Sequence, residues 1–244
     1  MAEQSTWQWC REAAVLSGSK EKPYFYLCKR LIDLILASFL LVLLLPLLAL
    51  IAILIKLHSP GPIIFVQDRV GARRRPNGGR KVWEIRTFPF YKFRSMYQGA
   101  DQSVHEAHIR DYVEGCSEIL KGNGSGATLK LSNDPRVTRV GRILRKTSLD
   151  ELPQLVNVLK GEMSLVGPRP VPIYEVTKYE DKHFERLAAL PGITGLWQVK
   201  GRCELPFEEM VRLDVEYVRK ASLWLDIKIL FQTLPAVLSG RGAE

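Results

Sequence analysis

The amino-acid sequence predicts an α-rich α/β domain that is attached to a membrane by an apolar helix near its N-terminus. A long apolar segment occupies residues 31–57, short strand-like segments follow it, and helical patterns fill most of the remaining chain. A chain of 244 residues is long enough for one such domain with a hydrophobic core. The strand-like segments lie at 63–67 and around Val82 and Tyr91, and the helical patterns lie at 100–120, 150–160, 173–190 and 207–240.

The apolar segment is long enough to enter a membrane. Between Leu31 and Leu57 only Asp33 and Lys56 are charged, one near each end. About 20 apolar residues suffice to span a bilayer core, whereas the apolar stretch of a secretory signal peptide has only ~7–15 residues. Length by itself therefore favours a single spanning helix.

Two other features favour a re-entrant hairpin, which enters and leaves the membrane by the same face. Lys and Arg accumulate on the cytoplasmic side of membrane segments, and here both flanks are basic. Pro46, near the middle, has no N–H for the carbonyl of Val42, so a kink is expected there. The residues alone support the spanning and re-entrant arrangements equally. The flanking cations are Lys20, Lys22, Lys29 and Arg30 before the segment, and Lys56, Arg69, Arg73, Arg74 and Arg75 after it.

The remaining chain is typical of a soluble domain. Three of the five residues at 58–62 are Pro or Gly and mark a break, and the arginine-rich segment 71–80 is predicted to be a loop. The glycine-rich segment 122–126 is predicted to be a flexible turn, because no Gly-Lys-Ser/Thr follows it as in a P-loop. Residues 222–240 fit an amphipathic helix at the membrane interface, with Trp224 at headgroup depth, or alternatively a buried core helix.

The composition narrows the class of partner. Lys and Arg number 35 against 26 Asp and Glu, and a net charge of +9 indicates an anionic partner: nucleic acid, acidic lipid or a phosphorylated substrate. A nucleic-acid partner is disfavoured because no recognised binding module is present. The cysteines are too far apart for a zinc site or a disulfide framework, which fits a reducing cytoplasm; they are Cys10, Cys28, Cys116 and Cys203.

The segment TSLDELPQL, residues 147–155, contains two adjacent carboxylates, Asp150 and Glu151. Ser148 and Glu151 match a capping box, but Pro153 would then break a helical hydrogen bond. A helix that starts at Asp150 or a near neighbour makes Pro153 the third helical residue, where no such bond is required. We therefore expect the acids at a helix N-terminus, where the helix dipole stabilises a carboxylate that binds Mg²⁺ or acts as a nucleophile.

Cationic side chains surround this acidic pair in the sequence. Arg169 lies between two prolines, which would hold it rigidly. Rigid guanidinium groups near two carboxylates are typical of a site for a diphosphate with Mg²⁺. The other cations of this set are Lys92, Arg94, Arg136, Arg139, Arg142, Arg145 and Lys146.

Five segments together resemble the bacterial sugar transferase family, the monotopic phosphoglycosyl transferases. The resemblance runs from about Lys29 to near the C-terminus, and its central block is highly specific. The large N-terminal region with several spans that some members carry is not found, so a compact catalytic-domain form is expected. In chain order the segments are KRLIDLILASFLLVLLLPLL, YKFRSM, NDPRVTRVGRILRKTSLDELPQLVNVLKGEMSLVGPRP, LPGITGLWQVKGR and SLWLDIKIL.

The resemblance implies an architecture. Residues 1–28 would be an N-terminal extension, 29–57 a re-entrant membrane helix broken at Pro46, and 58–244 a small cytoplasmic α/β catalytic domain with interfacial amphipathic helices. Because the family's membrane helix is re-entrant, the resemblance favours the hairpin over the spanning helix. The expected location is the bacterial inner (cytoplasmic) membrane, as a monotopic protein with its active site on the cytoplasmic face.

The resemblance also implies a reaction. Family members transfer a sugar 1-phosphate from a UDP-sugar to undecaprenyl phosphate or another polyprenyl phosphate, and they release UMP. The product is a polyprenyl diphosphate-sugar, the first membrane intermediate of a polysaccharide such as exopolysaccharide or lipopolysaccharide. Later glycosyltransferases of the same pathway are expected partners, and nucleic acid is not.

Individual residues of this chain match functional positions of the family. Asp150 matches the nucleophile, which forms a covalent phosphosugar intermediate, and Glu151 completes the acidic dyad. Mg²⁺ is implied at the dyad, with Asp150 and Glu151 as its expected ligands. The residues that match phosphate-binding and nucleotide-binding positions are Lys92, Arg145, Pro168, Arg169 and Pro170.

Two features depart from the family pattern, and one alternative function remains. Leu45 replaces the Ser that often precedes the helix-breaking proline, and the segment between Val70 and Phe93 is longer and more basic than in the smallest members. The alternative is a non-catalytic, membrane-anchored scaffold that binds acidic lipid or a partner enzyme. Such a scaffold would tolerate the loss of Asp150 and Arg169 and would depend on bulk charge.

Overall fold

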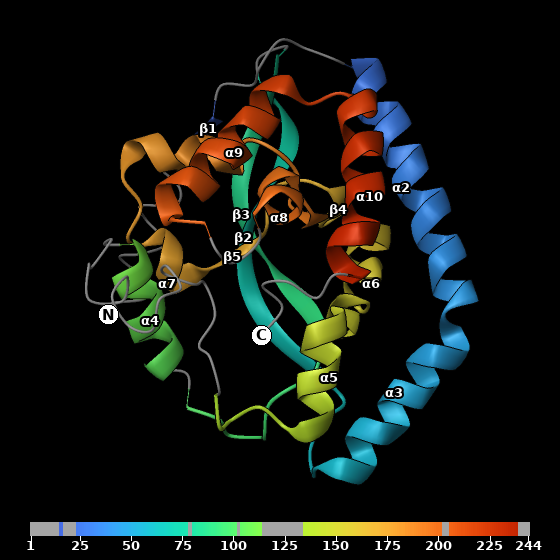
Figure 1. Cartoon of the computed structure of the whole chain (residues 1–244). Helices are drawn as coiled ribbons and strands as arrows, with labels where there is room; N and C mark the ends of the chain where they lie inside the picture. Colours follow the sequence, from blue (N-terminus) through green and yellow to red (C-terminus); the bar gives the residue numbers. More distant parts are fainter. Residues whose placement is uncertain are drawn as a thin grey trace.

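A long antiparallel hairpin of β2 (Ile64–Asn77) and β3 (Arg80–Phe93) runs through the middle of the molecule, with helices around it (Figure 1). This arrangement confirms the expected mixed α/β fold. The turn expected at 122–126 and the N-terminal residues 1–14 lie outside the described part of the chain. The computed structural model describes residues 15–16, 23–77, 80–101, 103–113, 134–201 and 205–238.

The loop predicted at residues 71–80 is wrong for residues 71–77 and 80, which belong to β2 and β3 and pair without interruption, whereas residues 78–79 lie outside the described chain. Successive side chains of a strand face opposite sides: Ala72 is buried, whereas Arg73 and Arg75 are exposed. The guanidinium carbon of Arg74 lies 3.8 Å from the centroid of the Tyr26 ring, so this cation packs on an aromatic surface. An arginine run that resembles a polar loop in sequence therefore forms a strand.

Two sheets hold the segment 167–170 at both of its ends. The hairpin belongs to a four-stranded antiparallel sheet in the order β1–β3–β2–β5, with β1 at Val15–Leu16 and β5 at Val171–Pro172. A second sheet pairs β4 (Ser164–Val166) with β6 (Gly192–Thr194) in parallel. Because β4 directly precedes the segment and β5 directly follows it, the segment that carries Arg169 has little freedom to move.

The expected helices are confirmed, except that residues 173–190 do not form one long helix. Instead, Glu180 caps a separate 3-10 helix at Asp181–Leu187, and the ring of His183 accepts a hydrogen bond from the Glu180 N–H. Two further helices were not predicted, α5 (Arg139–Thr147) and α8 (Leu196–Lys200). The confirmed helices are α4 (Ser103–Val113), α6 (Gln154–Lys160), α7 (Ile173–Val176), α9 (Phe207–Lys220) and α10 (Leu223–Leu238).

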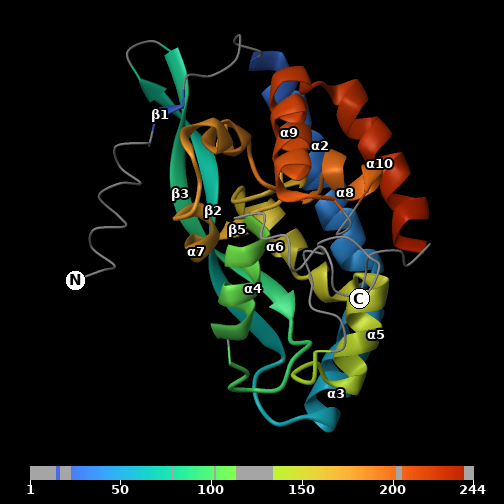
Figure 2. The same ribbon diagram turned by 60° about the vertical axis from the view of Figure 1, so that its left-hand side comes forward.

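The main hydrophobic core lies between the hairpin and helices α2, α6, α9 and α10 (Figure 2). Its most deeply buried side chains include Phe90 of β3, Val158 of α6, Leu213 of α9 and Ile229 of α10. Most of the segments beyond the apolar helix therefore fold around a single main core.

The apolar segment is broken at Pro46, as predicted. It forms α2 (Pro23–Leu43) and α3 (Leu45–His58), and the two helices are bent by 61° relative to each other. Pro46 is the second residue of α3, a position that requires no N–H. No single helix of the described chain is long and apolar enough to cross a membrane. The two helices of this bent pair, taken together, have sufficient length and apolar composition.

Polar side chains bind the first half of α2 to the domain. Lys29 donates to the Val166 carbonyl at 2.9 Å and forms a 2.6 Å ion pair with Asp226 of α10. Arg30 donates to the carbonyls of Val158 and Leu159 at the end of α6, and an oxygen of Asp33 accepts from the Leu165 N–H. Lys29 and Arg30 were predicted as cations that flank a membrane segment. In the structure they also donate hydrogen bonds to backbone carbonyls of the domain.

The second half of the bent pair packs on the same domain. Ile51 and Ile55 of α3 are buried with Phe93 and Leu144, and Leu149 and Leu152 pack against this cluster. The opposite face of both helices is exposed and apolar, and Figure 1 shows the pair running along one side of the molecule. The exposed apolar side chains on this face include Leu27, Leu31, Ile35, Phe39, Val42, Leu43, Leu45, Leu50, Ile53, Leu54 and Leu57.

Helix α10 combines features of both alternatives predicted for it. Ile229 and Asp226 are buried against the domain, whereas Trp224 and Phe231 are 75% and 71% exposed. One face of α10 therefore belongs to the core and the other presents aromatic side chains to the outside.

Replacing Gly141 with Ala is expected to displace α5. A Cβ atom at this position would collide with the backbone carbonyl of Ser95, which cannot move as a flexible side chain would. Because α5 also carries Arg145, we expect a destabilisation of about 1–3 kcal/mol from overpacking together with weaker binding of an anionic ligand. Chemical denaturation and ligand titration would test this, and Arg142→Ala, at an exposed position of the same helix outside the cavity, is the control.

Candidate active site

One cavity gathers most of the residues that were predicted for the site. Its volume is about 420 Å³, and it is walled by β2, β3, α4, α5, α7 and the segments around 150 and 170. Pro168 does not line it; its carbonyl accepts a hydrogen bond from the Gly192 N–H at 2.8 Å and so fixes the base of the 167–170 segment. The predicted residues that line the cavity are Lys92, Arg94, Arg136, Arg145, Asp150, Glu151, Arg169 and Pro170.

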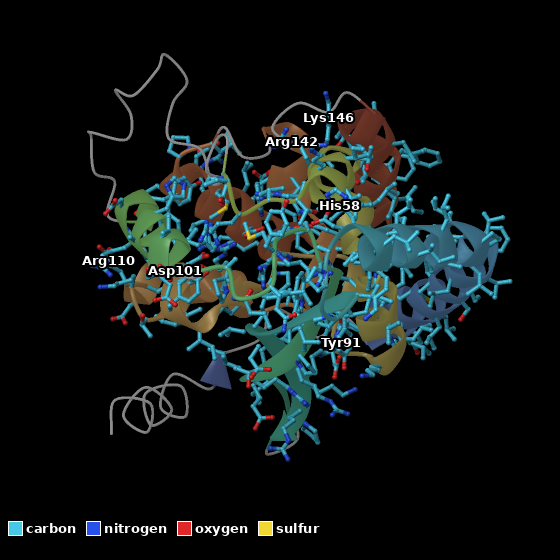
Figure 3. The ribbon with its side chains drawn as sticks, turned by 90° about the horizontal axis from the view of Figure 1, so that it is seen from below. His58, Tyr91, Asp101, Arg110, Arg142 and Lys146 are labelled. Carbon is cyan, nitrogen blue, oxygen red and sulfur yellow. The ribbon has the colours of Figure 1, made fainter. Side chains whose placement is uncertain are left out.

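Three of the predicted cations lie elsewhere. Arg139, Arg142 and Lys146 are exposed and do not line the cavity. Figure 3 shows Arg142 and Lys146 pointing outward from α5. Of the four cations on this helix, only Arg145 lines the cavity that holds the acidic pair.

Asp150 and Glu151 lie in a 3-10 turn, so the predicted helix start at Asp150 is wrong. The 3-10 helix covers Leu149–Glu151, and α6 begins only at Gln154, with Pro153 in the N-cap position. The capping box of Ser148 and Glu151, which Pro153 argued against, is absent, since the Ser148 side chain makes no cap hydrogen bond. Because Pro153 has no N–H to continue a helical ladder, the chain makes one tight turn before it and a helix after it.

This turn directs Asp150 inward. Ser148 adopts a left-handed backbone conformation with φ of 57°, which is uncommon for a residue other than glycine. Asp150 is only 9% exposed, and its neighbours Leu149 and Leu152 pack against the cluster around α3. The acid is thus held on a turn that is anchored from behind by apolar contacts.

Glu151 and Arg169 form an ion pair across the cavity wall. Arg169 Nη2 donates to Glu151 Oε1 at 2.6 Å, and both side chains are about four-fifths buried. The pair connects the dyad to the rigid segment between the two sheets. It therefore orients the guanidinium in the cavity that Asp150 also lines.

Lys92, at the end of β3, faces the same acids. Burial, and next the nearby Arg69, lower the pKa of Lys92 to about 8, although Asp150 acts in the opposite direction. Its ammonium lies 5.0 Å from the centroid of the Phe65 ring. With a pKa of about 8, Lys92 loses its charge just above neutral pH. A bound anion would favour the charged form and so raise this pKa.

Arg69 is a cavity residue that the sequence analysis did not assign to the site. It comes from β2, is 9% exposed, and donates to the Pro170 carbonyl at 2.8 Å. Burial and then Arg169 lower its pKa to about 10. In the sequence it was one cation among many, and only the pairing of β2 with β5 brings it beside Arg169.

Arg94 and Arg136 contact the cavity but have structural partners. Arg94 donates to the carbonyls of Ser59 and Pro60 and thereby fixes the turn after α3. Arg136 is paired with Asp134 at 2.6 Å. The cations that remain directed to the acids are therefore Lys92, Arg145, Arg169 and Arg69.

The acidic pair suits one type of metal site. No group of three or more His, Cys, Asp or Glu side chains in the described chain is placed to hold a metal ion. Mg²⁺ does not need such a group, because it usually keeps several waters and binds one or two carboxylates together with substrate phosphates. Asp150 and Glu151 are therefore compatible with Mg²⁺ and not with a zinc centre enclosed by protein ligands.

The charge on Lys92 predicts a pH dependence. Anion binding should weaken as the pH rises through about 8, because Lys92 loses its proton there. In a Lys92→Arg variant the guanidinium remains charged, so the decline in affinity should move upward by more than one pH unit. Measuring the Kd of a nucleoside diphosphate from pH 6.5 to 9.5 tests this, and identical profiles for both proteins would exclude Lys92 as the titrating group.

Comparisons with known proteins agree with this geometry. The sequence profile described as bacterial sugar transferase matches residues 24–240. The exopolysaccharide production protein ExoY of Rhizobium meliloti (strain 1021) is 40% identical over 222 residues, which cover 91% of this chain and 90% of that protein.

Two longer relatives are also similar. The undecaprenyl-phosphate galactose phosphotransferase of Salmonella typhimurium is 45% identical over 75% of this chain, and the match covers 35% of that protein. The UDP-glucose:undecaprenyl-phosphate glucose-1-phosphate transferase of Escherichia coli (strain K12) is 41% identical over 85% of this chain and 39% of its own length. The chain thus spans nearly all of ExoY but well under half of the two longer relatives. By the extent of the profile match and this identity, the chain belongs to the bacterial sugar transferase family.

Proposed function

We propose that this protein transfers a sugar 1-phosphate from a UDP-sugar to undecaprenyl phosphate or another polyprenyl phosphate, and releases UMP. The observation that carries the proposal is the cavity, in which an acidic pair lies among cationic side chains from four separate segments. The names of two relatives support the same reaction class, since one is a galactose phosphotransferase and the other a UDP-glucose transferase, both acting on undecaprenyl phosphate.

In the proposed reaction Asp150 is the nucleophile. A carboxylate oxygen forms a bond to the phosphorus that bears the sugar, and the bond from this phosphorus to the bridging oxygen breaks. UMP leaves with that electron pair, and the sugar phosphate remains on Asp150 as an acyl phosphate. A phosphate oxygen of the polyprenyl phosphate then attacks the same phosphorus and displaces Asp150, which gives the polyprenyl diphosphate-sugar.

The cations act by positioning and neutralising the phosphates. Phosphoryl transfer depends mainly on positioning and charge stabilisation. Arg169 is fixed by Glu151 at 2.6 Å, so its orientation is set before the substrate binds. Glu151 in this account orients Arg169 and completes the metal site.

Mg²⁺ belongs to the same proposal. Asp150 and Glu151 are the residues that would hold it, because Mg²⁺ binds one or two carboxylates together with substrate phosphates. When bound, the ion would neutralise charge on the diphosphate of the donor.

We also propose a position at the membrane. The exposed apolar face of α2 and α3 would enter the cytoplasmic leaflet as a re-entrant hairpin, with α10 at the interface and the catalytic domain, residues 58–244, in the cytoplasm. Both halves of the hairpin pack on one domain, which suits an element that does not cross the bilayer. Because Leu149 and Leu152 pack against α3, the acids would lie close to the depth of a polyprenyl phosphate headgroup.

This location would place the product where later glycosyltransferases extend it. The polyprenyl diphosphate-sugar carries free hydroxyl groups and remains in the leaflet. An enzyme that consumes it must therefore be a membrane-associated glycosyltransferase acting from the cytoplasmic side.

UMP release by the purified chain in detergent tests the proposed function. The assay contains Mg²⁺, undecaprenyl phosphate and a panel of UDP-sugars that includes UDP-glucose and UDP-galactose. We expect release that requires the lipid phosphate for multiple turnover and that favours one sugar. If a folded protein releases no UMP with any donor of the panel, the proposal is contradicted and a scaffold is favoured. The lipid binding of a scaffold should weaken steeply with salt.

A further inference from the structure

The cavity continues past the dyad to a far end that is enclosed by helices. This far end is formed by α4, α7, α8 and α9, and Figures 1 and 2 both show α4 beside α7. Four of its side chains are at most 4% exposed, in contrast to the partly exposed cations near the dyad. The four are Ile109, Glu175, Trp197 and Met210.

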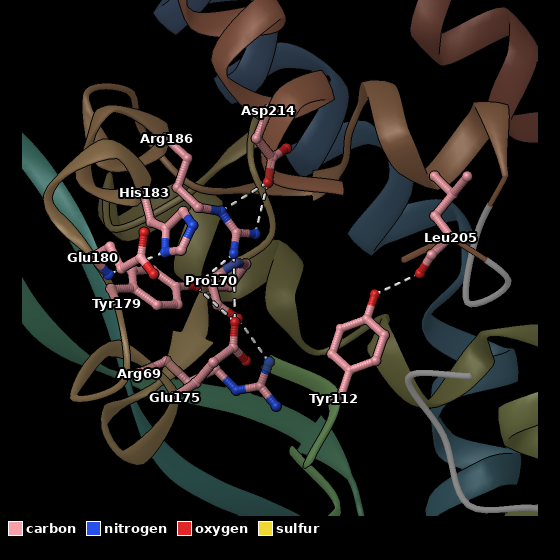
Figure 4. A network of polar contacts seen from close by, with 10 residues as sticks. All are labelled: Arg69, Tyr112, Pro170, Glu175, Tyr179, Glu180, His183, Arg186, Leu205 and Asp214. Carbon is pink, nitrogen blue, oxygen red and sulfur yellow. Dashed lines mark hydrogen bonds and ion pairs between the residues drawn. The ribbon is translucent and has the colours of Figure 1, made fainter. Parts of the chain in front are cut away.

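Glu175 is held rigidly at this far end. Its Oε1 atom accepts hydrogen bonds from the Tyr179 hydroxyl at 2.7 Å and from Arg186 at 3.4 Å (Figure 4). Arg186 is in turn fixed by Asp214 at 2.6 Å. Both of these hydrogen bonds are accepted by Oε1, so Tyr179 and Arg186 orient the carboxylate. Glu175 also lines the cavity.

Trp197 supplies an unmatched donor to the same wall. Its indole N–H is buried and has no acceptor among the described residues. A buried polar group without a partner costs about 1–3 kcal/mol, so a ligand in the cavity that offered this indole an acceptor would recover that free energy. His105 adds a neutral ring, because burial, and next Lys92, lower its pKa to about 4.

These groups suit a neutral ligand with several hydroxyls. A carboxylate accepts from hydroxyl donors, an indole N–H donates to a hydroxyl oxygen, and a neutral imidazole can do either. Phosphates are better matched near the dyad, where Lys92, Arg145 and Arg169 line the cavity. Arg69 links the two regions, since it interacts with both Glu151 and Glu175.

The order of events in the proposed reaction decides between the sugar and the uridine of the donor. UMP must leave before the lipid phosphate can attack, so the uridine needs an open side of the cavity. The sugar stays attached throughout, and an enclosed pocket would protect the acyl phosphate from water. The enclosed far end therefore fits the sugar better than the nucleoside.

We propose that the far end of the cavity binds the sugar ring of the donor, with Glu175 accepting hydrogen bonds from its hydroxyls and Trp197 donating one to them. This inference rests on the proposed function and assigns a substrate-specificity role to residues outside the dyad and the phosphate-binding cations.

The test compares donors with and without the sugar, using Trp197→Phe and Glu175→Gln in the full chain. For the UDP-sugar that the wild type prefers, we expect the KM to rise about 3–10-fold in Trp197→Phe and about 10–100-fold in Glu175→Gln. The Ki of UMP as a competitive inhibitor should stay within about twofold of wild type, because UMP has no sugar beyond its phosphate.

Glu208→Gln is the control, since Glu208 is a 63% exposed carboxylate on α9 that does not line the cavity and its loss should change neither constant. Parallel increases in the KM of the UDP-sugar and the Ki of UMP would overturn the inference and place the uridine at the far end. Unchanged constants in a folded Trp197→Phe protein would also overturn it. If the wild type releases no UMP with any donor, the proposed function itself fails, which is a separate result.

Discussion

Replacing Asp150 with Asn is expected to lower UMP release by at least about a thousandfold, as the loss of a covalent nucleophile does in other enzymes. The amide keeps the shape of the side chain but has no carboxylate oxygen to attack phosphorus. Asp150 is buried on a turn packed against α3, which fixes the position of its carboxylate in the cavity. The measurement is the steady-state rate of UMP formation with the preferred UDP-sugar.

Asp68→Asn is the matched control, because it makes the same chemical change in an exposed side chain on β2. Asp68 lies between Gln67 and Arg69, which both line the cavity, so alternation along the strand directs it to the opposite face. Its loss should leave the rate unchanged. Retained activity in Asp150→Asn together with lost activity in Glu151→Gln would assign the nucleophile to Glu151 instead.

The covalent step has a signature of its own. Without an acceptor lipid, the wild-type chain should release about one UMP per active site and then stop, because the sugar phosphate stays on Asp150. Intact-protein mass spectrometry should show the added mass of one sugar phosphate, and Asp150→Asn should show neither the burst nor the added mass. Release of UMP without any mass increase would indicate direct transfer between the two substrates.

The grouping of Asp150, Glu151 and Arg169 in one cavity was predictable from the sequence because these residues are near neighbours along the chain. Asp150 and Glu151 are adjacent, and Arg169 follows on a short proline-bounded segment. The break at Pro46 was predictable for the same reason, since a missing N–H is a local property. In each case a residue and its immediate context carry the information.

The features that the sequence did not reveal depend on contacts between distant segments. Arg69 enters the site only because β2 pairs with β5, and Glu175 and Trp197 meet only through the packing of helices around the core. Only the arginine-rich part of the hairpin, residues 71–80, was mistaken for a loop, because its arginines lie on aromatic rings and exposed edges. The position of the acids before α6 was missed because a proline is compatible with several places near a helix start.

Two cations that flank the apolar segment, Lys29 and Arg30, also have structural partners in the domain. Lys29 and Arg30 were interpreted as charges that stay in the cytoplasm. In the structure they bind carbonyls of β4 and α6, and β4 directly precedes the segment that carries Arg169. The same two side chains therefore connect α2 to the framework of the cavity.

Replacing Arg186 with Met is expected to destabilise the fold by about 3–5 kcal/mol, the usual cost of breaking a buried ion pair. Arg186 is fully buried between Asp214 and Glu175, which it contacts at 2.6 and 3.4 Å. Its removal leaves two buried carboxylates without their shared cation. Urea denaturation of the detergent-solubilised chain measures the loss, and Arg212→Met is the control, since that side chain is 60% exposed on α9 and should cost less than about 0.5 kcal/mol.

The cost of Arg186→Met should depend on pH. Burial raises the pKa of Asp214 to about 6 even with Arg186 beside it, and removing the guanidinium raises that pKa further. The folded protein then holds a proton more tightly than the unfolded chain, in which the pKa of an Asp is about 4. Stability must therefore fall as the pH rises from about 4 through the folded-state pKa. Denaturation at pH 5 and pH 8 should show the larger loss at pH 8, whereas equal losses would mean that charged Asp214 is not the source of the instability.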